Sequence, residues 1–338
     1  MRRNPVARQV LELSIALSDN VRTQPIIEGR VAPEGIRLVP TAVHPSEMFW
    51  RQLKFQEFDV SEMSISSYTI ATSQGPTPWV ALPIYTMRHF FHTGIMVRTD
   101  RGINKPADLK GKRVGVPEYQ QTAALWTRGV LQHEFGVLAR DMEWFMERSP
   151  ERSHGGSTGF KPPKGVKLNY IPPTTNIGEM LARGDLDATL LYLRENNLVD
   201  RSKTDLSAEP KVKTLFADPE GEKRRYFAKT GIYPINHCMV VRRSLLEKHP
   251  WIALNLYTAF IRAKEQVAKD AQGHLTSYLE SGLLDAKARG ALTQDPMAYG
   301  IKAARPVLET IMQYVYEQGL AKRRMTLDQL FAKSTLDV

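Results

Sequence analysis

The sequence predicts an α/β fold with mainly parallel sheets. The chain has 338 residues, which fits one large or two medium domains with real cores. Patterns typical of strands and of helices alternate from the start of the chain, as they do in proteins built from βα units. Hydrophobic residues make up 42% and charged residues 24%, which are ordinary proportions for a globular protein.

The first predicted strand covers residues 11–18. Leu11, Leu13, Ile15 and Leu17 alternate there with polar or small residues. A period of two indicates a half-buried strand, whereas the core of a secretion signal is an unbroken apolar run. We therefore expect a cytoplasmic protein.

The next elements follow from periodicity and capping signals. Ser46 is a suitable N-cap for a helix that runs to Glu57, and Ser66 or Ser67 can cap the helix after the third strand. Further along, Gly111 ends a single helical turn before a buried strand. The predicted strands after the first are 36–39, 60–65, 79–84, 94–97, 113–116 and 186–192, and the later helices are 122–135, 176–183, 250–269 and 306–318.

Composition limits the possible partners. Lys and Arg outnumber Asp and Glu by 46 − 36 = 10, a surplus that suits a basic solvated surface or a cleft for small anions. No nucleic-acid-binding motif accompanies these charges, and no apolar run reaches the ~18 residues of a membrane span, so we expect neither partner. The single cysteine, Cys238, excludes an internal disulfide and a site with several thiolate ligands.

Several segments carry a resemblance to known families. "KPADLKGKRVGV" at 105–116 and "GDLDATL" at 184–190 resemble type II periplasmic binding proteins. "RSHGGSTGFKPPKGVKLNYIP" at 152–172, "YFAKTGIYPINHCMVVR" at 226–242 and "YVYEQGL" at 314–320 look like the 4,5-dihydroxyphthalate decarboxylase family. The resemblance covers about 11–331. It implies a two-lobed, Venus-flytrap fold with one lobe at 11–97 plus 238–338, a second at 98–237, and a ligand cleft between them.

The same resemblance implies an activity. A member of this family would convert 4,5-dihydroxyphthalate to protocatechuate and CO₂, as a homo-oligomer. Direct loss of CO₂ would leave an aryl carbanion, but a hydroxyl para to the carboxylate gives another route: a base removes its proton, and a general acid protonates the ring carbon. No cofactor is needed in principle, and no cofactor motif is present. A non-catalytic binding protein for an aromatic or other small anion is the alternative.

Three residues are candidates for the acid–base chemistry. His237 follows Tyr233-Pro234 in a strand predicted to cross between the lobes, and is our first choice of proton donor, although a buried structural histidine has the same pattern. His89 is a second donor candidate; with His92 it could offer two metal ligands, but no carboxylates complete a metal site. Glu118 is a candidate base or an exposed first-turn glutamate.

The candidate substrate-binding residues lie at predicted strand–helix junctions, near the crossing or in the Gly-rich loop at 149–163. Helix N-termini favour carboxylates, and arginine binds them in a bidentate manner. For most of these side chains a plain structural role, such as a helix cap, a surface ion pair or a solvated loop, is the competing interpretation. The set is Asn20, Arg22, Ser66, Ser67, Tyr68, Arg88, Tyr119, Gln120, Thr122, Arg152, His154 and Tyr233.

Overall fold

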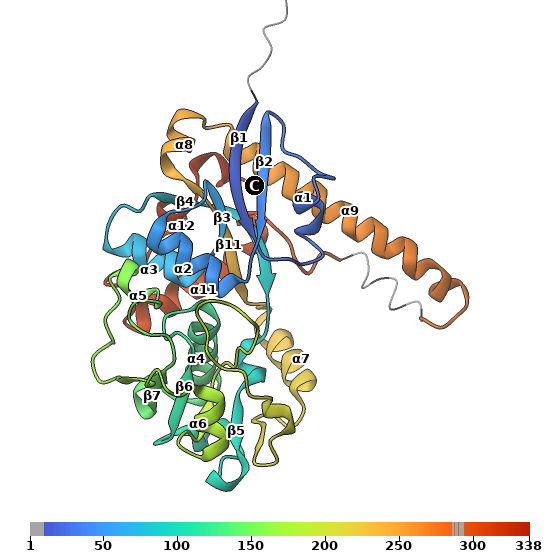
Figure 1. Ribbon diagram of the computed structural model, residues 1–338. Helices are drawn as coiled ribbons and strands as arrows, with labels where there is room; N and C mark the ends of the chain where they lie inside the picture. Colours follow the sequence, from blue (N-terminus) through green and yellow to red (C-terminus); the bar gives the residue numbers. More distant parts are fainter. Residues whose placement is uncertain (1–9, 286, 288–289, 291–293) are drawn as a thin grey trace, which may run out of the picture.

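The computed structural model describes residues 10–285, 287, 290 and 294–338. Two sheets form the cores of two lobes, which lie one above the other in Figure 1. The first sheet has the order β2-β1-β3-β11-β4. Its strands are β1 (Leu11–Leu17), β2 (Ile36–Ala42), β3 (Val60–Ser64), β4 (Trp79–Arg88) and β11 (Ile235–Arg242).

The second sheet has the order β10-β5-β9-β6-β7-β8. Strands β1, β2 and β3 of the first sheet pair in parallel, as do β6, β7, β8 and β9 of the second. In contrast, β11 in the first sheet and β5 in the second pair antiparallel to their neighbours. The strands are β5 (Met96–Arg98), β6 (Arg113–Val116), β7 (Glu143–Met146), β8 (Lys167–Tyr170), β9 (Ala188–Thr189) and β10 (Val212–Thr214).

The chain crosses between the sheets twice, between β4 and β5 and again before β11. These crossings lie within a few residues of the expected lobe boundaries at 97/98 and 237/238. The expected first lobe also includes residues 286, 288–289 and 291–293, which lie outside the described residues.

Helices cover the sheets, and the N-termini of three of them, α2, α3 and α4, lie between the two lobes. α9 extends well beyond the body of the first lobe (Figure 1), and α11 contacts both α3 of the first lobe and α4 of the second. The helices are α1 (Gln24–Ile27), α2 (Pro45–Phe55), α3 (Ile65–Gln74), α4 (Thr122–Phe135), α5 (Gly155–Thr158), α6 (Ile177–Arg183), α7 (Pro219–Thr230), α8 (Arg243–Lys248), α9 (Ile252–Glu280), α11 (Ile301–Glu317) and α12 (Leu327–Leu330).

Some expected element boundaries are correct and others move. The strand at 113–116 and the helix at 122–135 lie where the sequence predicts them. The predicted caps were wrong by a few residues: His44 caps α2 in place of Ser46, and Ser64 caps α3 in place of Ser66 or Ser67. Pro45 explains the first shift, because proline favours the first position of a helix and so places the cap one residue before it.

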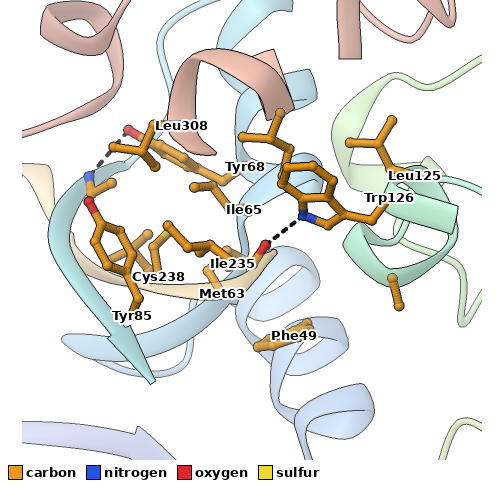
Figure 2. Close-up of a cluster of buried hydrophobic side chains, with 14 of the residues drawn as sticks. Phe49, Met63, Ile65, Tyr68, Tyr85, Leu125, Trp126, Ile235, Cys238 and Leu308 are labelled. Atoms are coloured by element: carbon orange, nitrogen blue, oxygen red, sulfur yellow. Dashed lines mark hydrogen bonds between the residues drawn. The ribbon is translucent and has the colours of Figure 1, made fainter. Parts of the chain in front are cut away.

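The hydrophobic core runs from one lobe into the other. Figure 2 shows Trp126 of α4 packed beside side chains of the first lobe, with its indole N–H donating to the carbonyl oxygen of Ile235 at 2.8 Å. One turn further along the same face of α4, a Cβ on Gly129 would lie 2.1 Å from the ring of Tyr314, so only glycine allows α11 this close. The two lobes are thus fixed against each other by buried apolar packing.

Candidate active site

A cavity of about 360 Å³ lies between the lobes, within the ~300–1,000 Å³ range of small-molecule sites. Loops at the ends of the first-lobe strands form one side of the cavity. The start of α4 and the segments that follow β7 and β9 form the other side. Its lining is Ser18, Asp19, Asn20, Arg22, His44, Pro45, Ser46, Phe49, Ser64, Thr86, Met87, Phe91, Gln121, Thr122, Ala123, Arg148, His154, Leu191, Leu193, Glu195, Asn236 and His237.

His237 faces the cavity from β11 and is paired with a buried glutamate. Glu62 lies on the neighbouring strand β3, a diagonal neighbour on the same face of the sheet. The Glu62 Oε2 accepts from the His237 Nδ1 at 2.9 Å, and both side chains are almost fully buried. The register of β11 against β4 shifts on both sides of His237, as at strand bulges that re-aim a side chain.

The carboxylate of Glu62 is fully used by hydrogen bonds. The hydroxyl and the backbone N–H of Ser18 each donate to Oε1 at 2.7 Å, and the Thr86 hydroxyl donates to Oε2 at 2.7 Å. Burial alone would raise the pKa of Glu62, but the bond from His237 and those from Ser18 and Thr86 hold this pKa below its usual value. Glu62 is therefore an ionised acceptor that fixes the imidazole of His237.

The tautomer of His237 follows from its second partner. The side-chain nitrogen of Asn236, which can only donate, lies 2.8 Å from Nε2. Nε2 is therefore the acceptor nitrogen, and the proton of the neutral ring is on Nδ1, toward Glu62. The edge of the His237 ring also packs against Phe49, with 4.7 Å between ring centroids.

His154 reaches the cavity from the second lobe. The Arg148 guanidinium lies 3.1 Å from its Nε2 and the Ser67 hydroxyl 2.9 Å from its Nδ1. Since arginine only donates, Nε2 accepts and Nδ1–H donates to Ser67. Burial, and then the charge of Arg148, holds the pKa of His154 well below its usual value. Arg148 itself forms a buried two-point ion pair with Asp200.

Positive groups suited to an anionic ligand line the same cavity. Arg22 donates through Nε and Nη2 to the carbonyl oxygen of Thr86 at 3.4 and 3.1 Å, which fixes its guanidinium at the cavity wall. Its neighbour Asn20 accepts from the backbone N–H of Arg22 and also lines the cavity. The N-termini of α2, α3 and α4 end at the cavity, each with the positive end of its dipole.

Several expected ligand residues join the lobes to each other. The Ser66 hydroxyl donates to the carbonyl oxygen of Gln120 at 2.6 Å, and the Thr122 hydroxyl lies 2.9 Å from that of Ser64. We call this set the interlobe seam; it consists of Ser64, Ser66, Ser67, Gln120, Thr122 and His154. Of its members, Ser64, Thr122 and His154 also line the cavity.

Other expected residues lie away from the cavity in the core. Tyr68 is buried, and its hydroxyl donates to the carbonyl oxygen of Leu330 at 2.6 Å (Figure 2 shows its place in the core). The ring of Tyr119 is buried under the guanidinium of Arg128, 3.9 Å from the ring centroid. Glu118 is buried rather than exposed, and accepts from the backbone N–H of His154 at 3.0 Å.

The remaining four expected residues lie near the crossing between the lobes or in the Gly-rich loop, and each either has a structural role or is exposed. Arg88 donates to the backbone oxygen of Tyr233, whose hydroxyl donates back to the carbonyl of Arg88. His89 is exposed and outside the cavity lining, and Arg152 is exposed and donates to the carbonyl oxygen of Leu198. None of these four lines the cavity.

Several polar residues of the site were not predicted from the sequence; among them are Glu62, Arg148, Asn236 and His44. Asn236 immediately precedes His237 in a recognised motif and could have been found by its position. His44 precedes Pro45 at the start of a predicted helix, which is a cap position. Glu62 had no local signal, because a glutamate inside a buried strand shows its partner only after the sheet forms.

Neither a metal site nor a membrane-spanning segment is found in the part of the chain that the structure describes. No cluster of three or more His, Cys, Asp or Glu residues has the arrangement of a metal site there. The helices of the described ranges are all too short or too polar to cross a bilayer.

Comparison with solved structures defines the class of protein. The fold matches the periplasmic aliphatic sulphonate-binding protein of Escherichia coli with a TM-score of 0.51 and 13% identity, over 97% of this chain and 99% of that one. It also matches the alkanesulfonate-binding protein of Xanthomonas axonopodis pv. citri (TM-score 0.52, 14% identity, 93% of this chain and 95% of that one). A family model for the periplasmic substrate-binding protein of phosphonate ABC transporters matches residues 36–157. The chain therefore has the two-lobed fold of periplasmic binding proteins, and the expected fold class is confirmed.

Sequence relatives narrow this class to one family. A 4,5-dihydroxyphthalate decarboxylase of Comamonas testosteroni is 34% identical over 332 residues, which cover 97% of this chain and 98% of the relative. A protein of the same name from Pseudomonas putida is 37% identical over 221 residues, covering 65% of this chain and 83% of the relative. The chain belongs to the 4,5-dihydroxyphthalate decarboxylase family, as the sequence motifs predicted.

Proposed function

We propose that the protein is a carboxy-lyase that removes one carboxylate from 4,5-dihydroxyphthalate, giving protocatechuate and CO₂. Family membership supports this reaction. The observation that carries it into the structure is the buried Glu62–His237 pair, whose unprotonated Nε2 accepts from the Asn236 side chain at the cavity between the lobes. A glutamate behind a histidine is suited to removing a proton, because the carboxylate stabilises the imidazolium that forms.

In this mechanism His237 is the base. Its Nε2 carries no proton at rest and accepts from the Asn236 side chain. The substrate hydroxyl para to the reacting carboxylate would take the place of this amide and give its proton to Nε2. This revises the donor role expected from the sequence. As the proton leaves, negative charge moves to the ring carbon that bears the carboxylate, and that carbon takes a proton from solvent water. The C–C bond then breaks to release CO₂, and its electron pair restores the aromatic ring and the phenolate oxygen. The hydroxyl proton then returns from His237.

The rest of the cavity would hold the substrate. Its apolar lining, which includes Phe49 and Phe91, suits an aromatic ring, and Arg22 and the helix N-termini suit two carboxylates. If both lobes bind the two carboxylates, the ring and its hydroxyls are held in a fixed orientation toward His237. Such orientation of the reacting groups lowers the entropic part of the activation barrier.

The direct test is to incubate the purified protein with 4,5-dihydroxyphthalate and to measure CO₂ and protocatechuate. Phthalate is the matched control, because it has both carboxylates but lacks the hydroxyl whose proton starts the reaction, and it should release no CO₂. In D₂O the product should carry one deuterium at the carbon that lost the carboxylate. Tight binding of the dihydroxy compound without any CO₂ would support instead a binding protein, the role of the sulphonate-binding proteins that share the fold.

We also propose that the enzyme works in the cytoplasm as a homo-oligomer. Residues 11–17 form β1 inside the first sheet, which supports their assignment to the folded domain. Tyr278 near the end of the projecting helix α9 and Leu283 beyond it are 53% and 75% exposed, which suits a surface covered in an oligomer. Cell fractionation tests the cytoplasmic location, and light scattering of the purified protein tests the oligomeric state.

A further inference from the structure

His44 lies at the N-terminus of α2 and lines the cavity. It is the N-cap of this helix: its Nδ1 accepts from the backbone N–H of Ser46 at 3.3 Å. A backbone N–H only donates, so Nδ1 must be unprotonated while the cap is in place. The proton of the neutral ring is therefore on Nε2, the nitrogen that takes no part in the cap.

The surroundings of His44 favour the same neutral form. Burial lowers its pKa; Asp200 and Glu195 of the second lobe oppose this, while Arg148 of the second lobe and His237 of β11 act in the same direction as burial. A proton added to the ring would have to go on Nδ1, against the Ser46 N–H and the positive end of the α2 dipole. The helix thus keeps His44 neutral by geometry as well as by burial.

The other cavity histidines cannot offer an N–H to a ligand in this way. His237 presents an acceptor nitrogen, and both ring nitrogens of His154 are bonded within the protein. Among the imidazoles that line the cavity in the described residues, His44 is the one whose N–H has no protein partner. A donor without a protein partner on a cavity wall is suited to bind an anionic oxygen.

We infer that His44 binds a carboxylate of the substrate as a neutral imidazole, through an Nε2–H that the N-terminus of α2 fixes in that tautomer. This inference rests on the proposed function for the identity of the ligand, an aromatic dicarboxylate. It assigns to His44 a positioning role, in which binding does not depend on protonation of the histidine, while His237 carries the proton transfer.

The test variant is His44→Asn, because asparagine also accepts the N-cap bond but is too short to reach the ligand. With phthalate as an unreactive probe, calorimetry should show binding weakened by roughly 10–100-fold, the effect of losing one hydrogen bond to a charged group. The melting temperature without ligand should stay close to that of the wild type. His44→Ser, which also caps helices, gives the same test if the first variant does not fold.

Two further measurements address the tautomer. Nitrogen-15 NMR of histidine-labelled protein, assigned with His44→Asn, should show His44 as the Nε2–H tautomer between pH 6 and 8. Between pH 6 and 8, the affinity for phthalate should have the same pH dependence in the wild type and in His44→Asn. An imidazolium signal for His44, or a fall in affinity with rising pH that disappears in His44→Asn, would overturn the inference.

The outcomes separate this inference from the proposed function. A wild-type protein that releases CO₂ from 4,5-dihydroxyphthalate, with unchanged phthalate binding in His44→Asn, overturns the role of His44 and leaves the decarboxylase. If the wild-type protein releases no CO₂ but its phthalate binding depends on His44, the decarboxylase proposal is wrong and the carboxylate site at His44 is supported.

Discussion

The wall of the cavity built from β3, β11 and the start of α2 differs from the interlobe seam that adjoins it at Ser64. On the wall, His237 is bonded within the protein to Glu62 and Asn236, whereas His44 uses only Nδ1, which caps α2. In the seam, hydroxyls and imidazole are bonded largely to one another across the lobes, as in the bond between Ser67 and His154. The polar groups that hold the lobes together thus differ from those suited to act on a ligand, and residue type alone does not distinguish them.

The largest expected difference between the two regions is in turnover. His237→Ala should lower kcat by ~10²–10⁴, the usual contribution of a positioned acid or base. Phthalate binding should change little, because the carboxylate ligands are elsewhere. Steady-state kinetics beside melting curves make the measurement. Near-normal turnover in a stable variant would show that the base lies elsewhere in the cavity.

Glu62→Gln tests the carboxylate that fixes the ring of His237. The pKa of Glu62 is lowered from 4.5 in the folded protein, so its stabilising contribution is present above that pH and is lost as pH falls through the folded value. The variant should be less stable at pH 7, by ~1–3 kcal/mol for a buried hydrogen bond changed at one partner. It should also lose less stability than the wild type between pH 5 and 3. Parallel acid-unfolding curves in the two proteins would contradict the paired, ionised state.

Stabilisation by phthalate and by benzoate compares a ligand that fills two carboxylate sites with one that fills a single site. Phthalate at 100 times its Kd should stabilise the protein by about 2.7 kcal/mol through mass action. Benzoate at the same concentration should do much less, because it leaves one carboxylate site empty. Thermal melts with both compounds are sufficient, and equal shifts would remove the idea of two carboxylate sites.

The smallest effects belong to the seam and the core. Ser67→Ala removes the bonds of the hydroxyl to His154 and Ser64. Tyr68→Phe removes the bond to the Leu330 carbonyl and the bond accepted from the Ala81 N–H. Each variant should cost ~1–3 kcal/mol of stability, with KM and kcat within about threefold of the wild type. Thermal melts and initial rates compare them directly. A large rise in KM for Ser67→Ala would place the seam among the substrate ligands after all.

The fold could be predicted from the sequence because its signals are local. Alternation at 11–17 and the turn at Gly111 depend on neighbours within a few residues, and the motifs at 105–116 and 226–242 identify the family without the structure. His237 could also be found, since it lies inside such a motif and only histidine titrates near neutral pH.

The assignment of roles required the tertiary structure. Ser66, Ser67, Tyr68 and Glu118 have the right chemistry for ligands, but residues distant in the sequence use their polar atoms. Glu62 carries no signal of its own until β3 and β11 pair. Whether a side chain can act on a ligand depends on the hydrogen-bond partners that packing places beside it at the cavity, and no local pattern in the sequence specifies those partners.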